Sequence, residues 1–138
     1  MIVAGIDIGS LTSKALIMEG DKILASCLMP TGSSSQQAIQ RIRELISTQT
    51  GLSLEALDFV VATGYGRIKV DFADKQVTEI SCHAKGISYL FPEVRTVIDI
   101  GGQDSKVIRI NDKGKVMDFA MNDKCAAGTG RFLEVMAR

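Results

Sequence analysis

Two stretches of the chain place the same chemically active residue types at the same spacing. They read "GIDIGSLTSK" at residues 5–14 and "VIDIGGQDSK" at residues 97–106, with Ile-Asp-Ile-Gly and Ser-Lys shared. In each stretch a strand ends in Asp-x-Gly, and a tight turn with small and hydroxyl residues follows. Successive backbone N–H groups then point into the mouth of the turn, which makes a concavity that binds phosphate oxygens. The repeat therefore predicts two phosphate-binding loops.

Acidic residues in these loops indicate how the charge of a bound phosphate is balanced. Asp7 and Asp99 end the strands and would repel phosphate unless a cation intervened. Mg²⁺ bridges carboxylates and phosphates, and because it usually keeps several waters, we expect each Asp to hold it through water. We expect Gln103 to orient an attacking water, and Asp104 to act as a base or to contact the ligands of the metal. The predicted phosphate-binding glycines, hydroxyl residues, lysines and amide are Gly9, Ser10, Thr12, Ser13, Lys14, Gly101, Gly102, Gln103, Ser105 and Lys106.

The same turns have an ordinary structural explanation. Asp-Gly and Gly-Gly pairs are common in β-hairpins, and an Asp at a strand end can simply cap a turn. Finding the pattern twice favours phosphate binding over this explanation. The sequence contains no G-x-x-x-x-G-K-[ST] loop and no strand-linked G-x-G-x-x-G, so it predicts neither a P-loop nor a Rossmann fingerprint.

A cysteine in a segment rich in small residues is a second candidate for chemistry. Cys125 lies in "NDKCAAGTGRFLE", just ahead of the expected C-terminal helix. The N-terminus of a helix favours the thiolate, which raises both nucleophilicity and metal affinity. A lone buried cysteine is more often an inert apolar residue, so this segment alone leaves both explanations open. Cys27 and Cys82 are expected in the core, and His83 forms no metal site with Cys82 because adjacent helical residues face different directions.

Apolar runs and turn signals predict the elements that carry these loops. Residues 2–8, 15–18 and 23–28 form three apolar runs, which predict a meander of strands. Apolar residues at helical spacing follow, and Gly51 is expected to end that helix. The elements expected after it are a strand at 58–62, the loop "TGYGR" at 63–67, a strand near 75–80, a helix from about 82 to 90, and strands at 96–100, 106–110 and 115–120.

The two copies of the repeat are followed by unequal lengths of chain. Ile6 and Ile98 are as far apart as Lys14 and Lys106, so the copies align without a gap. Such a repeat indicates two similar supersecondary units. Helix and strand segments follow the first meander, whereas only a loop and one helix follow the second. We therefore expect a first α/β domain at residues 1–93 and the opening of a second at residues 94–138.

The composition indicates a globular protein without a strongly charged surface. Apolar residues make up 46% of the 138 residues and charged residues 23%, which suits a chain with a buried core. Lys plus Arg and Asp plus Glu each number 16, so neither nucleic acid nor an anionic membrane is an expected partner. The N-terminus has no basic region, and no apolar run approaches the roughly 18 residues of a membrane span, which predicts a cytoplasmic protein. An odd number of cysteines favours thiols or metal ligands over disulfides.

Five segments together carry a resemblance to a known family: "GIDIGSLTSKA", "ATGYGR", "DKQVTEISCHAKG", "VIDIGGQDSKVI" and "NDKCAAGTGRFLEVMA". Over essentially the whole chain they resemble the N-terminal half of the activator component of 2-hydroxyacyl-CoA dehydratases. That family includes ATPase subunits of benzoyl-CoA reductase. The resemblance implies a ribonuclease H-like fold of the actin, hexokinase and heat-shock chaperone ATPase superfamily, with a mixed sheet flanked by helices.

The resemblance also implies an activity. In the family a homodimer binds MgATP in each subunit and shares one [4Fe–4S] cluster between subunits. ATP hydrolysis drives a low-potential electron, taken from a donor such as ferredoxin or flavodoxin, into a 2-hydroxyacyl-CoA dehydratase or a related enzyme of CoA substrates. Residues 7–14 and 99–106 match the two phosphate loops, and Cys125 matches a cluster ligand.

One departure from the family affects the cluster. Each family subunit supplies two cysteine ligands, and the second lies beyond the matched motif. Two copies of this chain offer two matching thiolates, whereas a [4Fe–4S] cluster needs four. We therefore expect a truncated chain that holds no stable cluster, binds ATP weakly or not at all, and associates through an exposed face of the second meander. Two alternatives remain, namely a redox-free kinase of the same fold and a non-enzymatic module.

Overall fold

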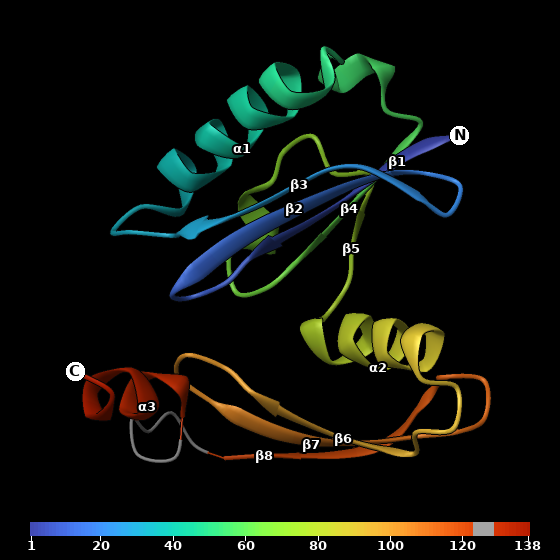
Figure 1. The fold of residues 1–138 in the computed structure, drawn as a ribbon, viewed down its shortest axis with the longest axis vertical. Helices are drawn as coiled ribbons and strands as arrows, with labels where there is room; N and C mark the ends of the chain where they lie inside the picture. Colours follow the sequence, from blue (N-terminus) through green and yellow to red (C-terminus); the bar gives the residue numbers. More distant parts are fainter. Residues whose placement is uncertain (123–128) are drawn as a thin grey trace. The chain divides into compact units, whose positions relative to one another are not determined.

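The computed structural model describes residues 1–122 and 129–138 and divides into two compact units, Met1–Thr78 and Glu79–Arg138. Each unit contains one β-sheet, and Figure 1 shows the elements of both. The predicted loops lie on different units, residues 5–14 on the first and residues 97–106 on the second.

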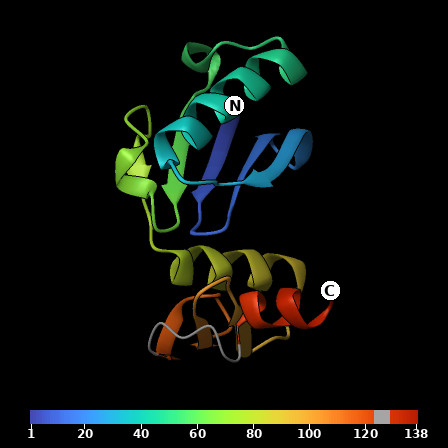
Figure 2. The ribbon, with the colours of Figure 1, turned by 90° about the vertical axis from the view of Figure 1, so that its left-hand side faces the viewer.

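The first unit is built on a five-stranded mixed sheet. Its strand order is β3-β2-β1-β4-β5, and the first three strands form the predicted antiparallel meander. β4 then runs parallel to β1 at its other edge, as Figure 2 shows. The elements are β1 (Ile2–Ile8), β2 (Thr12–Glu19), β3 (Lys22–Pro30), α1 (Ser35–Thr50), the short 3-10 helices η1 (Leu54–Ala56) and η2 (Arg67–Lys69), β4 (Phe59–Thr63) and β5 (Lys75–Gln76).

Helix α1 forms where the sequence provides both a cap and an apolar face. The Ser34 side chain accepts a hydrogen bond from Gln37 N, which satisfies one of the free N–H groups of the first turn. Gly51 ends the helix as predicted, in the left-handed conformation at φ 69°, and its N–H donates to Ser47 O.

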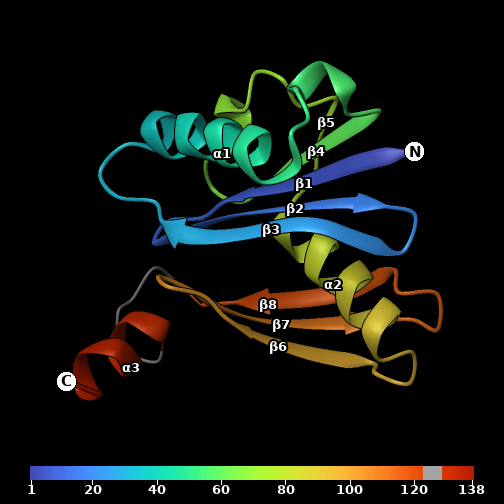
Figure 3. The ribbon, with the colours of Figure 1, turned by 45° about the horizontal axis from the view of Figure 1, so that its top comes forward.

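Helix α1 covers one face of the first sheet and closes its core (Figure 3). Strand residues on that face alternate with exposed or half-buried neighbours, as expected for a sheet with one covered face. The buried apolar residues of this core are Ala4, Ile6, Ile8, Ala15, Ile17, Ala25, Ile39, Ile42, Ile46, Val60, Ala62 and Val70.

The second unit is built on the second predicted meander. Its antiparallel sheet has the order β6-β7-β8, and α2 packs on one face through Ala84, Ile80 and Ile87. The elements are α2 (Glu79–Leu90), β6 (Thr96–Ile100), β7 (Ser105–Ile110), β8 (Val116–Met121) and α3 (Gly130–Met136). Among residues 1–122 and 129–138, no helix is long and apolar enough to cross a membrane.

One sequence-based expectation differs from the structure. The strand expected near residues 75–80 is only Lys75–Gln76, because Glu79 and Ile80 already belong to α2. Glu79 suits the first turn of that helix, where a carboxylate interacts favourably with the helix dipole. Because α2 packs on the second sheet, the compact units divide ahead of α2, whereas the expected boundary lies after residue 93. The boundary between the two ATPase domains stays a prediction.

Candidate functional site

The two predicted loops have the same strand register. In the first, Asp7 of β1 pairs with Lys14 of β2, and in the second, Asp99 of β6 pairs with Lys106 of β7. Paired residues of an antiparallel ladder point to the same face, so each carboxylate lies beside a lysine. The sequence repeat is therefore a structural repeat at the positions that bear charge.

The turns of the two loops are also closed by the same hydrogen bond. Gly9 N donates to Thr12 O at 3.1 Å, and Gly101 N donates to Asp104 O at 2.8 Å. The first turn requires glycine at this position, whereas the second is only tightly packed there. A Cβ on Gly9 would lie 2.6 Å from Thr12 O, and one on Gly101 would lie 3.0 Å from Asp104 Oδ1. The two turns are thus equivalent in the backbone, although their middle residues differ.

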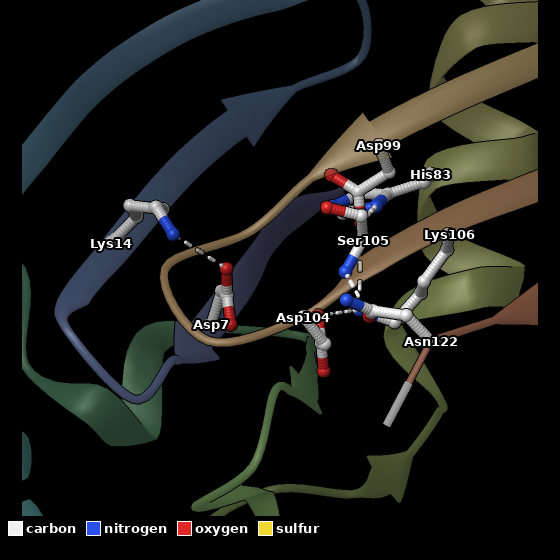
Figure 4. A network of polar contacts seen from close by, with 8 residues as sticks. All are labelled: Asp7, Lys14, His83, Asp99, Asp104, Ser105, Lys106 and Asn122. Atoms are coloured by element: carbon white, nitrogen blue, oxygen red, sulfur yellow. Dashed lines mark hydrogen bonds and ion pairs between the residues drawn. The ribbon is translucent and has the colours of Figure 1, made fainter. Parts of the chain in front are cut away.

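In the first loop the lysine binds the aspartate directly. Lys14 Nζ donates to Asp7 Oδ2 at 2.9 Å, as shown in Figure 4. Neighbouring Ser13 is fully buried, and its hydroxyl lies 2.8 Å from Thr31 Oγ1, which itself donates to Gly9 O. Since Thr31 has one hydroxyl proton, Ser13 is the donor to Thr31. This chain of bonds ties the end of β3 to the first loop and holds the turn in shape.

In the second loop the charged groups are arranged differently. Lys106 is 4% exposed, and its Nζ lies 2.5 Å from Asp104 Oδ1 but 3.6 Å from Asp99 Oδ2. His83 of α2 contacts Asp99 in the position that lysine has in the first loop, with its Nδ1 3.0 Å from Asp99 Oδ2 (Figure 4). One residue difference explains the two arrangements of the lysine. The first loop has Thr12 where the second has Asp104, and the Asp104 carboxylate binds Lys106.

These contacts shift the pKa values of two groups. The hydrogen bond from His83 is the main cause of a lowered pKa at Asp99; the positive charges of His83 and Lys106 add to it and outweigh the opposing effect of burial. Burial by itself would lower the pKa of Lys106, but the hydrogen bond and charge of Asp104, with the charges of Asp99 and Glu79, raise it. These shifts favour the charged forms of the Asp99 carboxylate and the Lys106 ammonium.

Residues further along the chain support the second loop. Asn122 Oδ1 accepts a hydrogen bond from Ser105 N at 2.7 Å. Gly130 N, at the start of α3, donates to Gly101 O at 2.8 Å, and the fully buried Thr129 lies with its hydroxyl 3.4 Å from Gly102 O. The backbone of this turn is thus held from two sides.

The structure places the remaining predicted residues as follows. Gln103 is exposed in the second turn, and Ser10 is half-buried in the first. Cys125 lies outside the described residues. Sequence reasoning missed four residues that bond to the loops: Thr31, His83, Asn122 and Thr129. Their contacts join distant parts of the chain, and no local spacing signals them.

The residues present fit a magnesium-bound phosphate at the first loop. Thr63 of β4 pairs with Asp7, and its Oγ1 is buried without a hydrogen-bond partner among residues 1–122 and 129–138. Gly64 leaves no room for a Cβ, which would collide with the Asp7 carboxylate. A carboxylate, an ammonium and an unsatisfied hydroxyl at one strand end suit a hydrated cation and phosphate oxygens.

The described residues do not supply a site for an iron–sulfur cluster. Cys27 lies in β3 and Cys82 in α2, on different units. Within the described ranges, no group of three or more His, Cys, Asp and Glu side chains could hold a metal ion.

Comparisons with known proteins agree with the fold. The activator of lactoyl-CoA dehydratase from Anaerotignum propionicum is 54% identical over 142 residues, covering 100% of this chain and 53% of the relative. The structure of the activator of 2-hydroxyisocaproyl-CoA dehydratase from Clostridium difficile with bound ADPNP superimposes with a TM-score of 0.89 at 49% identity, over 99% of this chain and 51% of that one. A Ppx/GppA phosphatase from Aquifex aeolicus, at 17% identity and a TM-score of 0.58 over 88% of this chain and 52% of that one, shares the fold alone.

These matches confirm the predicted fold class, since the chain has half of an actin-like, ribonuclease H-like ATPase fold. The chain spans about half the length of the relatives it matches. A family description matches residues 4–138, nearly the whole sequence. The chain belongs to the BadF/BadG/BcrA/BcrD ATPase family.

Proposed function

We propose that this chain carries the two phosphate loops of an ATP-hydrolysing activator, which drives a low-potential electron into a 2-hydroxyacyl-CoA dehydratase or a related enzyme of CoA substrates. The observation that carries the proposal is the repeated Asp–Lys register of two glycine turns. The relatives support the reaction class, because one is an activator of lactoyl-CoA dehydratase and another an activator with bound ADPNP.

In this proposal the loops bind the phosphates of ATP. N–H groups in the middle of each turn, other than those of Gly9 and Gly101 that close the turns, face phosphate oxygens, while Lys14 and Lys106 offset their charge. Mg²⁺, when bound through water to Asp7 in the first loop or to Asp99 in the second, would neutralise the phosphates and orient them. Gln103 is exposed and free of strand pairing, which suits a residue that orients the attacking water.

Asp104 has a more constrained role in the proposed reaction. Its Oδ1 is bonded to Lys106, so a proton taken from water would have to be received at Oδ2. We keep Asp104 as the proposed base or as a contact to the ligands of the metal. Ser10, Thr12 and Ser105 complete the proposed phosphate contacts. Ser13, also expected to bind phosphate, is fully buried and bonded to Thr31, so its hydroxyl shapes the turn from within.

The remaining parts of the proposal rest on family membership. Cys125 is the proposed ligand of a [4Fe–4S] cluster shared between two subunits of the whole protein. The proposed partners are the dehydratase and an electron donor such as ferredoxin or flavodoxin. Residues 1–93 would form the first ATPase domain, and residues 94–138 would open the second.

Nucleotide binding tests the proposal first. Amide shifts of the isotope-labelled chain, titrated with MgATP, should move at both turns, and D7N should abolish the Mg²⁺-dependent part of the response. Because we expect the 138-residue chain to bind ATP weakly, the titration is carried to high MgATP and repeated on a longer protein that includes the rest of the second domain. Shifts at neither turn in both proteins would reject nucleotide binding and leave the non-enzymatic module. Transfer of the γ-phosphate to a sugar, without iron, would favour the kinase.

Iron content tests the redox part. Anaerobic reconstitution of the 138-residue chain should yield no stable cluster, because Cys125 is the one thiol that matches a family ligand. In a longer protein with both ligands, a cluster should form and C125S should remove it. A cluster near four irons per dimer of the 138-residue chain would contradict this expectation.

A further inference from the structure

The loop "TGYGR", residues 63–67, lies against the first phosphate loop. β4 runs parallel to β1 and ends at Thr63, which pairs with Asp7 at the carboxyl end of β1. Parallel strands bring their carboxyl ends to the same edge of a sheet, and ligands of open α/β sheets bind at that edge. The loop therefore starts beside Asp7, the carboxylate residue of the first phosphate loop.

The backbone of this loop fixes the position of the Asp7 side chain. Gly64 is buried at φ +84°, and a Cβ there would collide with Asp7 Oδ1 and lie 2.6 Å from Ile8 O. Gly66 N donates to Ile8 O at 2.8 Å, and Arg67 Nη1 donates to Gly64 O at 3.0 Å. The carboxylate is thus held between Lys14 on one oxygen and a rigid glycine on the other.

The hydroxyl of Thr63 has no hydrogen-bond partner in the part of the chain that the structure describes, although the atom is buried. Buried polar groups are nearly always bonded, and an exception at a strand end beside a carboxylate requires an explanation. A valine would have nearly the same shape without the unsatisfied group. A ligand oxygen that forms a hydrogen bond with the hydroxyl would explain why this position is a threonine.

We propose that Thr63 is a ligand-binding residue whose hydroxyl holds an oxygen at Asp7, either a phosphate oxygen or a water bound to Mg²⁺. The inference rests on the proposed function, because it deepens the first phosphate site. Loop 63–67 is then the third segment that forms this site, together with the turn at Gly9 and strand β2, which carries Lys14. As a hydroxyl both donates and accepts, Thr63 can serve either kind of oxygen.

The test compares two substitutions at one position with one control. T63V removes the hydroxyl and keeps the shape, T63S keeps the hydroxyl, and T96V makes the same change at an exposed strand position of the other unit. Amide shifts of Gly9, Ser13 and Gly64 in the whole 138-residue chain report the binding of Mg²⁺ alone, pyrophosphate alone and MgADP.

The expected result separates binding from stability. T63V should weaken MgADP binding about tenfold, the order expected for a hydrogen bond to a charged ligand, whereas T63S and T96V should bind like the wild type. The melting temperature of T63V should be equal to or above that of the wild type, because an unsatisfied hydroxyl is lost and valine favours strands. A change in the Mg²⁺ response alone assigns the hydroxyl to a metal-bound water, and a change in the pyrophosphate response assigns it to a phosphate oxygen.

Two outcomes overturn the inference while the proposed function stands. Wild-type affinity in T63V would mean that the hydroxyl touches no ligand, and a lower melting temperature in T63V would mean that a protein group already binds it. If neither the wild-type chain at high ligand concentration nor a longer protein with the rest of the second domain responds to MgADP or pyrophosphate, the proposed function fails and this inference fails with it.

Discussion

His83 Nδ1 lies 3.0 Å from Asp99 Oδ2, so a helix residue makes the contact to the second loop that Lys14 makes to Asp7 in the first. The exchange follows from Asp104, which draws Lys106 away from Asp99. The two loops share a backbone but hold their carboxylates by different means.

Removal of His83 should loosen the second loop. We expect H83A to lower the free energy of unfolding by about 1 kcal/mol, because Asp99 loses its main hydrogen-bond donor. H83N should recover part of the loss, since its amide can donate from nearly the position of Nδ1. Chemical denaturation measures both. K85A serves as the control, because Lys85 is an exposed residue of the same helix; an equal loss in K85A and H83A would contradict the assignment.

The stability contributed by Asp99 should depend on pH. Its folded-state pKa is lowered from 3.8, so its contribution is present above that value and is lost as the pH falls through the folded-state pKa. The difference in unfolding free energy between the wild type and D99N should be constant near neutral pH and shrink below about pH 4. Denaturation at a series of pH values checks this. A difference that grows on acidification would reverse the sign and reject the prediction.

Substitution of the two equivalent lysines should have unequal effects. Lys106 is 4% exposed and Lys14 is 45% exposed. K106M leaves two carboxylates without their ammonium and should cost about 1–3 kcal/mol, whereas K14M should cost less than about 1 kcal/mol. Because the pKa of Lys106 is raised above 10.5, its contribution is complete below that pH and is lost as the pH rises through the folded-state value. Equal losses from the two substitutions would show that burial does not set the difference.

Alanine substitutions at two glycines in the left-handed region should distinguish the cost of a steric collision from the cost of backbone strain. Gly64 and Gly20 both have positive φ, but a Cβ has open space at Gly20 and collides with Asp7 at Gly64. G20A should therefore cost only the backbone strain, about 1–2 kcal/mol, and G64A should cost clearly more. Thermal unfolding of the two variants gives the comparison. A similar shift in melting temperature for both would mean that the loop moves away from the carboxylate without penalty.

The uncovered face of the second sheet should make the chain associate. Ile98 is 72% exposed, whereas its counterpart Ile6 is 1% exposed beneath α1. Exposed apolar faces of this kind promote association. Light scattering after gel filtration should show larger species at high concentration, and I98K should reduce them while Q40K, which adds the same charge on α1, should not. A wild-type chain that stays monomeric at high concentration would contradict this.

Strand and helix positions were predictable where local patterns determine them. The meanders follow from apolar runs broken by turn residues, and Gly51 ended α1 because only the left-handed conformation completes that cap. The start of α2 was misplaced because Val77, Thr78 and Ile80 are β-branched residues, which favour strands, and so short a segment does not distinguish the strand period from the helix period.

The partners of the loops were not predictable, because they depend on packing between distant elements. His83 reaches Asp99 only because Ala84 beside it packs into the sheet, which fixes the rotation of α2. Thr63 reaches Asp7 only through the parallel pairing of β1 and β4. Parallel pairing leaves no trace in residue spacing.

The two turns have the same length and the same strand register, so each can be exchanged for the other. Residues 8–13 separate Asp7 from Lys14, and residues 100–105 separate Asp99 from Lys106, so a chimera that exchanges them inserts and deletes nothing in either sheet. A chain with two Thr12-type turns or two Asp104-type turns would keep its ladder intact. Such chimeras can assign hydrolytic competence to a particular turn sequence, independently of the domain that carries it.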